Sequence, residues 1–558
     1  MLAIMLKQKF HLLVLFATLT LLIGFYTSCK KTDVSSPKDT YSINTSADSL
    51  SFTDSGGKRT FTITSNAPTA VYLNSGTDWV SYSPKDTVNP ANGYTVTITV
   101  PRFDQDNGKR TTQLTIRSGN LATDEVVRKF ITITQTGPVV GPRSPGIYTV
   151  KDLSDMAVAV VGNLDYSKWQ DANGVINLMK DIDGGATLLP CIGAQTVTSD
   201  TVGAFTGVFD GNGHTIKGTL DGSGKPLVAL FTRLAPTGII RNLTVDVNAL
   251  NDYANTDVQP HLAALVGFSV TATTGGIENC VTKGTLTRTG TATNPRVGGV
   301  VAFGRCNITG CNNYATITSS SNRVAGINGA GGGTFTIKDC NNYGDINADC
   351  AAAQVGGIIG QLNGQTVIGC TNYGNLKATA NGNTVIGGIA GNSQGSSSIG
   401  SASSACENKG KITLLASAAG PGTSCGAGGI SGGETAAVPF VNCKNSADVT
   451  SQVDNALVGV GGIVGNTSTA TTFTNCSNGA STNITSAQNA GSIIGLTTKA
   501  MTLNSCSNAG NIKWLGATVP AKFIGGIIGN DKASILTSCI YAGTVLGSPG
   551  TSSNAIGN

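Results

Sequence analysis

Three tyrosines recur at one position of a repeated sequence. They occupy the middle of Asn313-Tyr314-Ala315, Asn342-Tyr343-Gly344 and Asn372-Tyr373-Gly374. If the repeats stack on one another, the three rings form a short ladder. A ladder that faces water could bind a sugar chain through CH–π contacts and through hydrogen bonds from the neighbouring asparagines, whereas a ladder that faces inward would only stack. The sequence leaves both alternatives open.

Acidic side chains that could work as a catalytic pair are dispersed. Hydrolases and lyases of polysaccharides need carboxylates, or bases with cationic groups, clustered on one face. Between residues 260 and 558, only Asp345 and Asp349 lie close together in the sequence. The nine acidic residues of that region are Glu278, Asp339, Asp345, Asp349, Glu407, Glu434, Asp448, Asp454 and Asp531. We therefore expect no catalytic residue and no enzyme activity.

One histidine follows an aspartate closely, in Asp210-Gly211-Asn212-Gly213-His214. His214 beside Asp210 could be a catalytic pair, but this run of Asp, Asn and Gly is typical of a tight turn, which we favour. His261 has no evident partner. Because the chain has no Cys-x-x-Cys and only two histidines follow residue 28, we expect no metal site and no cofactor.

The first 28 residues have the features of an export signal. Lys7 and Lys9 precede an apolar run of about 14 residues, too short to span a bilayer comfortably. The run ends in Gly24-Phe25-Tyr26-Thr27-Ser28-Cys29, which resembles the lipobox of bacterial lipoproteins. The resemblance implies that Cys29 begins the mature chain and carries acyl chains, which bind the membrane. An uncleaved anchor helix and a plain secretory signal are the alternatives.

The segment after the lipobox indicates where in the cell envelope the protein is located. Residues 29–40 are polar and are typical of a flexible tether. In Bacteroidetes lipoproteins, a lysine followed by acidic residues after the cysteine directs the protein to the cell surface. This chain has Lys30-Lys31-Thr32-Asp33, with one acid only. The resemblance implies an outer membrane lipoprotein and leaves exposure at the cell surface open.

Composition excludes some classes of protein. The mature chain would have 530 residues, enough for several domains, and the low share of charged residues (12% of the chain) does not fit intrinsic disorder. The formal net charge is +5 and the basic residues are scattered, which gives no electrostatic case for binding nucleic acid. We therefore expect no nucleic acid as a partner; the expected partners are the membrane, through the lipid, and polysaccharide, mucin or host glycan.

Residues 41–136 alternate polar and apolar side chains between turn signals, which predicts a β-sandwich. The clearest strands are residues 60–64, 94–100, 113–117 and 130–134. The order of Leu50-Ser51-Phe52, Gly56-Gly57, Asp78-Trp79-Val80 and Ile131-Thr132-Ile133 resembles a BACON domain, an immunoglobulin-like module. The resemblance implies an association with glycan-handling proteins. Trp79 could be a stacking platform for sugar or part of the core, and the domain could be a binding module or a spacer.

A Pro/Gly-rich linker over residues 137–146 separates this domain from residues 147–558. Residues 150–161 have apolar side chains at helical spacing and predict a short helix that caps the open end of the adjoining stack of strands.

Internal repetition predicts the architecture of the rest. From about residue 260 to 558, a Gly-Gly-apolar-apolar pattern is followed about 14 residues later by Cys-x-Asn-x-Gly/Ala. The repeat cysteines, 29 to 37 residues apart, are Cys280, Cys311, Cys340, Cys370, Cys406, Cys443, Cys476, Cys506 and Cys539. This period fits the coils of a right-handed parallel β-helix, and the pattern resembles the GLUG-type repeats of bacterial surface proteins.

Stacked coils would align identical residues in columns. We expect the cysteines to point inward as small hydrophobes, with disulfides between occasional neighbours as the alternative. We expect the asparagines to lie at a bend, where their amides bond to the next coil, and the glycines to turn the chain where no Cβ fits.

The sequence therefore predicts an all-β lipoprotein: a BACON-like sandwich followed by a β-helix that binds glycan or host surface in the manner of an adhesin. The first alternative is a structural or assembly lipoprotein without a glycan ligand. The second is a polysaccharide lyase or hydrolase built on the β-helix.

Overall fold

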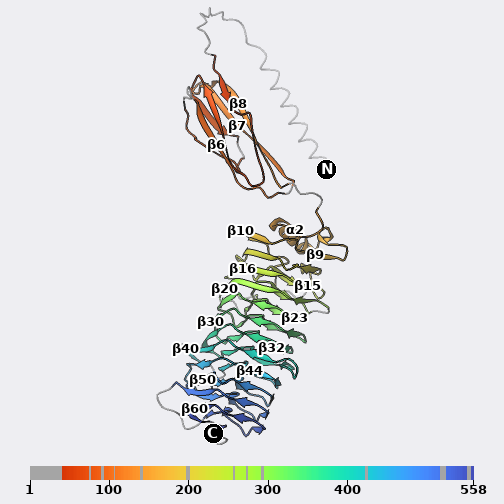
Figure 1. Ribbon diagram of the computed structural model, residues 1–558, viewed down its shortest axis with the longest axis vertical. Coiled ribbons are helices and arrows are strands. Elements are labelled where there is room, and N and C mark those ends of the chain that lie inside the picture. The colour runs from red at the N-terminus through yellow and green to blue at the C-terminus, as the bar shows by residue number, and fades with distance from the viewer. Residues whose placement is uncertain are drawn as a thin grey trace, which may run out of the picture. The chain divides into compact units, whose positions relative to one another are not determined.

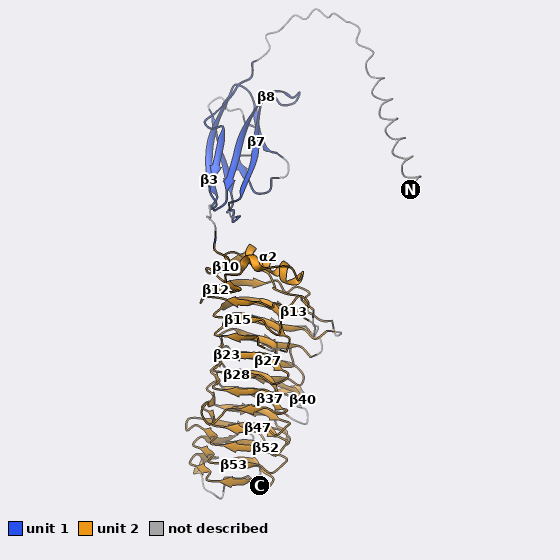
Figure 2. Cartoon of the chain, turned by 90° about the vertical axis from the view of Figure 1, so that its right-hand side faces the viewer, with its two compact units in different colours: residues 1–143 blue, residues 144–558 orange. Residues whose placement is uncertain are grey.

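The computed structural model describes residues 40–558, except residues 75–76, 89–92, 106, 139–142, 197–200, 256–257, 272–273, 291–293, 422–424, 516–522, 550–553 and 558. The chain divides into two compact units, residues 1–143 and 144–558 (Figure 2). The export signal and Cys29 lie outside the described residues. The protein is all-β, with about 3% helix. Within the described ranges, no helix is long and apolar enough to cross a membrane.

The described part of unit 1 contains eight strands. Their bounds are β1 Ile43–Thr45, β2 Ser49–Phe52, β3 Gly57–Ser65, β4 Thr69–Leu73, β5 Ser81–Ser83, β6 Tyr94–Val100, β7 Lys109–Asn120 and β8 Glu125–Thr136. They form two four-stranded sheets, in the orders β1-β3-β6-β5 and β2-β8-β7-β4. Both sheets contribute alternate apolar residues to one core, as Val96, Ile98 and Val100 of β6 illustrate.

Unit 2 is a parallel β-solenoid of about 11 turns. Its first strands are β9 (Val175–Asn177) and β10 (Ile182–Leu189), and its last are β60 (Thr544–Val545) and β61 (Ser548–Pro549). Strands of successive coils stack into sheets of 21, 12, 10 and 10 strands, and most coils contribute two strands to the largest sheet (Figure 1). The parallel stack predicted from the repeat is confirmed.

One coil shows the plan that the others repeat. It comprises β23 (Asn307–Thr309), β24 (Asn312–Asn313), β25 (Thr316–Ser319), β26 (Arg323–Ala325) and β27 (Asn328–Gly331). The next coil follows in parallel register, so that Ile308 pairs with Ile337 and Asn313 with Asn342. The inward side chains of all coils form one continuous apolar core.

The glycine pairs lie at the bend between two consecutive strands of a coil. A Cβ on Gly299 would collide with the amide oxygen of Asn313 and with the carbonyl oxygen of Gly326. Gly357 stands in the same relation to Asn372. As expected from the sequence, no side chain fits at these positions.

The repeat cysteines point into the core. Eight of the nine are buried, Cys539 is partly buried, and all are free thiols. The Cys340 thiol donates to the carbonyl oxygen of Ile308, 3.5 Å away. The bend lies one residue before eight of the nine cysteines, Cys406 being the exception, rather than at the asparagine: Gly310 and Asp339, which precede cysteines, have φ of 65° and 53°. The expectation that the repeat asparagines lie at the bend is wrong, because they are strand residues, whereas the expected bonding of their amides to the next coil is confirmed.

A helix, α2 (Val150–Val161), lies at the N-terminal end of the stack (Figure 2). Thr149 caps it by accepting from the backbone N–H of Asp152, whose carboxylate in turn accepts from the N–H of Thr149. Leu153, Met156 and Val160 are buried in the core of the solenoid. A 3-10 turn, η1 (Ser167–Trp169), comes next along the chain.

Candidate functional site

A column of buried asparagines sets the register beneath the three tyrosines. Nδ2 of Asn313 donates to Oδ1 of Asn342, and Nδ2 of Asn342 donates to Oδ1 of Asn372, each at 2.8 Å. The column continues through Asn408, Asn445, Asn478 and Asn508. Each tyrosine follows its asparagine directly in the sequence. The column therefore places the tyrosines at equivalent positions of successive coils.

The tyrosines of this column face water. Tyr314, Tyr343 and Tyr373 are 46%, 38% and 40% exposed. Their rings stack with centroids 4.5 Å and 4.6 Å apart and planes within 4° and 7° of parallel. We call these three residues the tyrosine ladder. They directly follow strands β24, β29 (Asn341–Asn342) and β34 (Thr371–Asn372).

Stacking decides which parts of the ladder a ligand can reach. Because neighbouring rings cover each other's faces, the ladder presents mainly ring edges and hydroxyl groups to water. Partial burial and, to a smaller extent, the neighbouring Tyr314 and Tyr373 raise the pKa of Tyr343. Its hydroxyl therefore keeps its proton at neutral pH. CH–π contact to the inner faces, one mode expected from the sequence, would require the rings to separate, whereas hydrogen bonding to the hydroxyls requires no movement.

Lysines extend the same column beyond the tyrosines. Lys283 occupies the position of Tyr314 in the preceding coil, because the residues just before them, Thr282 and Asn313, pair with each other. Lys409 follows Tyr373, and its Nζ lies 5.1 Å from the centroid of the Tyr373 ring. The hydrogen-bonded ion pair with Glu407, at 3.1 Å, raises the pKa of Lys409. The sequence analysis did not predict these lysines as site residues, although their positions in the repeat could have revealed them.

Amide and carboxylate groups line the ladder on both sides. Asn341 donates to the side-chain oxygen of Asn312 at 2.9 Å. On the other side, Asp345 accepts from the backbone N–H of Asn375 at 2.8 Å and from its side-chain amide at 3.2 Å. This strand face thus offers hydroxyl, amide, carboxylate and ammonium groups in parallel rows. Such a surface is suited to hydrogen-bond a polyhydroxylated chain.

Trp79, the fourth candidate residue, lies in unit 1. It is partly buried against the core of that unit. The Arg110 guanidinium carbon lies 4.3 Å from the centroid of the Trp79 ring and also 4.3 Å from that of Phe103. Arg110 donates to Oε1 of Gln135, which holds it in place. One face of Trp79 is therefore covered by protein.

The structure separates the two members of the possible catalytic pair. Nδ1 of His214 lies 3.1 Å from a carboxylate oxygen of Asp181, whereas Asp210 forms an ion pair with Arg241 at 2.7 Å. Asn212 donates its backbone N–H to Asp210 at 2.9 Å and has a φ of 50°, which makes the segment a turn. Within the described ranges, no group of three or more His, Cys, Asp or Glu side chains could hold a metal ion.

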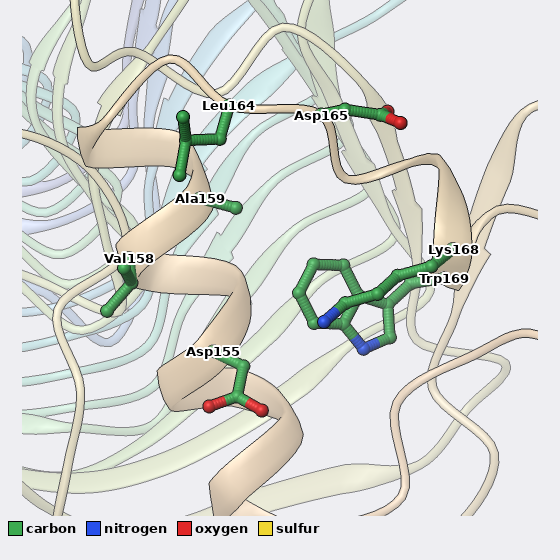
Figure 3. A pocket seen from close by; sticks show the side chains of 7 residues that line it. All are labelled: Asp155, Val158, Ala159, Leu164, Asp165, Lys168 and Trp169. Atoms are coloured by element: carbon green, nitrogen blue, oxygen red, sulfur yellow. The ribbon is translucent and has the colours of Figure 1, made fainter.

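A shallow pocket of about 290 Å³ lies beside α2 (Figure 3). Its lining residues are Asp155, Val158, Ala159, Leu164, Asp165, Lys168 and Trp169. Nζ of Lys168 lies 4.1 Å from the centroid of the Trp169 ring, and only 5% of Trp169 is exposed. The indole is therefore not free to stack on a ligand.

Comparisons with known proteins give limited resemblances. No family model matches the chain. Halomucin of Haloquadratum walsbyi is 29% identical over 189 residues, which are 32% of this chain and 2% of halomucin. The chain thus spans a very small part of the curated relative that it matches.

Among solved structures, a candidate immunoglobulin A1 protease of Bacteroides ovatus has a TM-score of 0.27 and 15% identity, covering 72% of this chain and 83% of that one. A Bacteroides ovatus xyloglucanase in complex with a heptasaccharide has a TM-score of 0.15 and 11% identity, covering 38% of this chain and 56% of that one. TM-scores this low support no conclusion about activity.

Proposed function

We propose that the protein binds glycan chains without cleaving them, through the solenoid face that carries the tyrosine ladder. The observation that carries this proposal is the exposure of Tyr314, Tyr343 and Tyr373 in one column. Large aromatic side chains with a polar tip are favoured at binding surfaces because they combine apolar contact with a hydrogen bond. The rows of amides beside them add donors and acceptors that suit sugar hydroxyls.

We further infer a location at the cell envelope. The lipobox-like end of the export signal supports lipidation at Cys29 and an outer membrane lipoprotein. The similarity to halomucin, a protein named as a mucin, supports a role at the cell surface. In this proposal, unit 1 is a BACON-like β-sandwich that acts as a spacer or an additional binding module. α2 caps the first coil of a right-handed β-helix.

A structural role is the second candidate. The specific observation in its favour is that the tyrosine rings cover each other's faces and stand above a hydrogen-bonded asparagine column. Both features stabilise the stack by themselves, without any ligand.

Retention and product release separate these functions in one experiment. Full-length protein, purified in detergent, is immobilised and exposed to gastric mucin and to a panel of neutral and acidic polysaccharides. Retention without new reducing or unsaturated ends is the expected result. Release of such ends would overturn the non-catalytic proposal, and failure to retain any member of the panel would favour the structural role.

A further inference from the structure

Three arginines gather on a part of the solenoid away from the tyrosine ladder. Arg296 of β21 (Arg296–Gly298) pairs in register with Arg323 of β26, and Arg305 follows β22 (Val301–Gly304). Strands in register lie about 4.8 Å apart. We call Arg296, Arg305 and Arg323 the basic cluster.

Aromatic rings and a histidine pack against two members of the basic cluster, Arg296 and Arg305. The Arg296 guanidinium carbon lies 4.1 Å from the centroid of the Phe303 ring, and that of Arg305 lies 4.9 Å from the same centroid. His261 is fully buried, pairs in register with Arg296 and stacks on Phe268 with centroids 6.1 Å apart. Cation–π contact orients the guanidinium groups but does not satisfy their N–H donors.

No acidic side chain among the described residues neutralises the positive charge of the basic cluster. Within the described ranges, none of the three arginines forms an ion pair with Asp or Glu, whereas Arg241 and Arg128 do. Asp257 lies outside those ranges. Instead, Arg296 donates to the amide oxygen of Gln259 at 2.6 Å and Arg323 to that of Asn294 at 3.2 Å. Neutral partners leave the like charges to repel each other.

The local hydrogen bonding is also incomplete. In the described residues, the buried Nε donors of Arg296, Arg305 and Arg323 have no hydrogen-bond partner. Buried polar groups are normally paired, so these three donors are available to an acceptor such as an oxyanion.

Because the guanidinium groups are largely buried, the lack of a counter-charge disfavours their charged forms. The pKa of Arg296 is lowered to about 9, first by burial and then by repulsion from Arg323 and Arg305. Burial, together with Arg296 and Arg323, lowers the pKa of His261 to about 3, so the ring is neutral at physiological pH. The charge that needs a partner is therefore that of the arginines.

We propose that the basic cluster binds oxyanion groups, sulfate or carboxylate, carried by an acidic polysaccharide. Guanidinium is well suited to this task because its planar N–H groups match the two oxygens of a carboxylate or sulfate. Arg296 and Arg323, in register on successive coils, place two such sites along the direction of stacking. This site lies on different sheets from the tyrosine ladder and does not depend on it.

A pair of double variants tests the proposal in the full-length protein in detergent. Binding of dextran sulfate, polygalacturonate, neutral dextran and a single-stranded DNA oligonucleotide is measured by calorimetry. We expect dextran sulfate, polygalacturonate or both to bind, neutral dextran not to bind, and R296Q/R323Q to weaken binding at least tenfold. The difference between the two acidic probes tells a sulfate site from a carboxylate site.

The control double variant K499Q/K513Q removes the same charge from exposed lysines on the last coils. It should bind as the wild type does. An equal loss of polysaccharide binding in both double variants would show that the net charge of the protein causes the effect, and would overturn the proposal. Absence of binding to both acidic polysaccharides, or binding to DNA alone, would overturn it as well.

A second measurement needs no substitution in the cluster, in case R296Q/R323Q does not fold. Phenylglyoxal modifies accessible arginines of the wild-type protein, and peptide mass mapping locates them. The acidic polysaccharide that binds should protect Arg296, Arg305 and Arg323 but not Arg128, which is already paired with Asp124 in unit 1. Equal modification with and without the polysaccharide would contradict the proposal.

Discussion

Nδ2 of Asn342 donates a hydrogen bond to Oδ1 of Asn372 in the next coil, at 2.8 Å. The same Nδ2 also donates to the carbonyl oxygen of Gly344, two residues along its own coil, at 2.9 Å. Each asparagine thus ties down its own coil and joins it to the next. Gly357 leaves the space that the Asn372 amide occupies, which explains why a glycine pair and an asparagine recur together.

Replacing one asparagine of this column should destabilise the solenoid. Asn342→Ala leaves two buried acceptors, Oδ1 of Asn372 and the carbonyl oxygen of Gly344, without their donor, and removes one of the two acceptors of Nδ2 of Asn313. At about 1–3 kcal/mol for each unpaired buried group, the total loss is about 3 kcal/mol. The midpoint of thermal unfolding by circular dichroism measures it. Asn347→Ala, at an exposed position of the same coil, should change the midpoint little. Equal effects would show that the column does not hold the coils together.

A methyl group at the second glycine of a pair should destabilise the solenoid by about as much as the loss of an asparagine of the column. In Gly357→Ala, the new Cβ would overlap the Asn372 amide and the carbonyl oxygen of Gly388, so strands must shift. Overpacking of this kind costs about 1–3 kcal/mol. Chemical denaturation compares it with Gly332→Ala, where the nearest atoms would lie 3.6 Å away. A Gly357→Ala protein as stable as the control would contradict the packing described for the pair.

Thiol titration distinguishes the inward thiol column from disulfides. Ten of the thirteen described cysteines are buried, and burial raises the pKa of Cys306 and Cys406 to about 11. Since the thiolate is the reactive form, these groups should react with a disulfide reagent only slowly in the native protein. In guanidinium chloride without reductant, all thirteen should react. A smaller number in the unfolded protein would reveal disulfides.

Glu434 should make stability depend on pH. Burial raises its pKa from the ordinary 4.5 to about 8, while its carboxyl accepts from the backbone N–H of Val438 at 3.0 Å. Below pH 4.5 the group is neutral in both states and has no destabilising effect. Between pH 4.5 and 8 only the unfolded chain ionises, so stability falls as the pH rises.

Glu434→Gln keeps the acceptor and removes the charge. It should raise the unfolding midpoint more at pH 9 than at pH 5. Glu278→Gln, at an exposed position, should have the same small effect at both pH values. If the wild type and Glu434→Gln depend on pH in the same way, Glu434 is not ionising in a buried site.

The repeat made the solenoid predictable because its period, its inward cysteines and its glycine pairs are all local sequence features. The Cys340 and Asn342 columns could be foreseen as soon as coils were assumed to stack. The exact position of the bend could not, because the left-handed residue varies in type: it is glycine at 310 and aspartate at 339.

The sites were harder to predict because they form between coils. The distance between stacked coils is close to the separation at which aromatic rings stack, so Tyr343 covers the faces of its neighbours, a consequence that the sequence pattern alone does not reveal. The basic cluster combines Arg296 and Arg323, which occupy one repeat position, with Arg305, which follows a different strand. Only the first two could have been found by aligning the repeats.

The central claim is that the tyrosine ladder binds glycan through its exposed hydroxyls. Binding of the full-length protein in detergent to immobilised gastric mucin, measured by surface plasmon resonance, tests it with Tyr343→Phe and Tyr343→Ala. The matched control is Tyr72→Ala, because Tyr72 of unit 1 is also 38% exposed. We predict that both Tyr343 variants bind at least tenfold more weakly while Tyr72→Ala binds as the wild type does. Unchanged binding by both Tyr343 variants would contradict the claim.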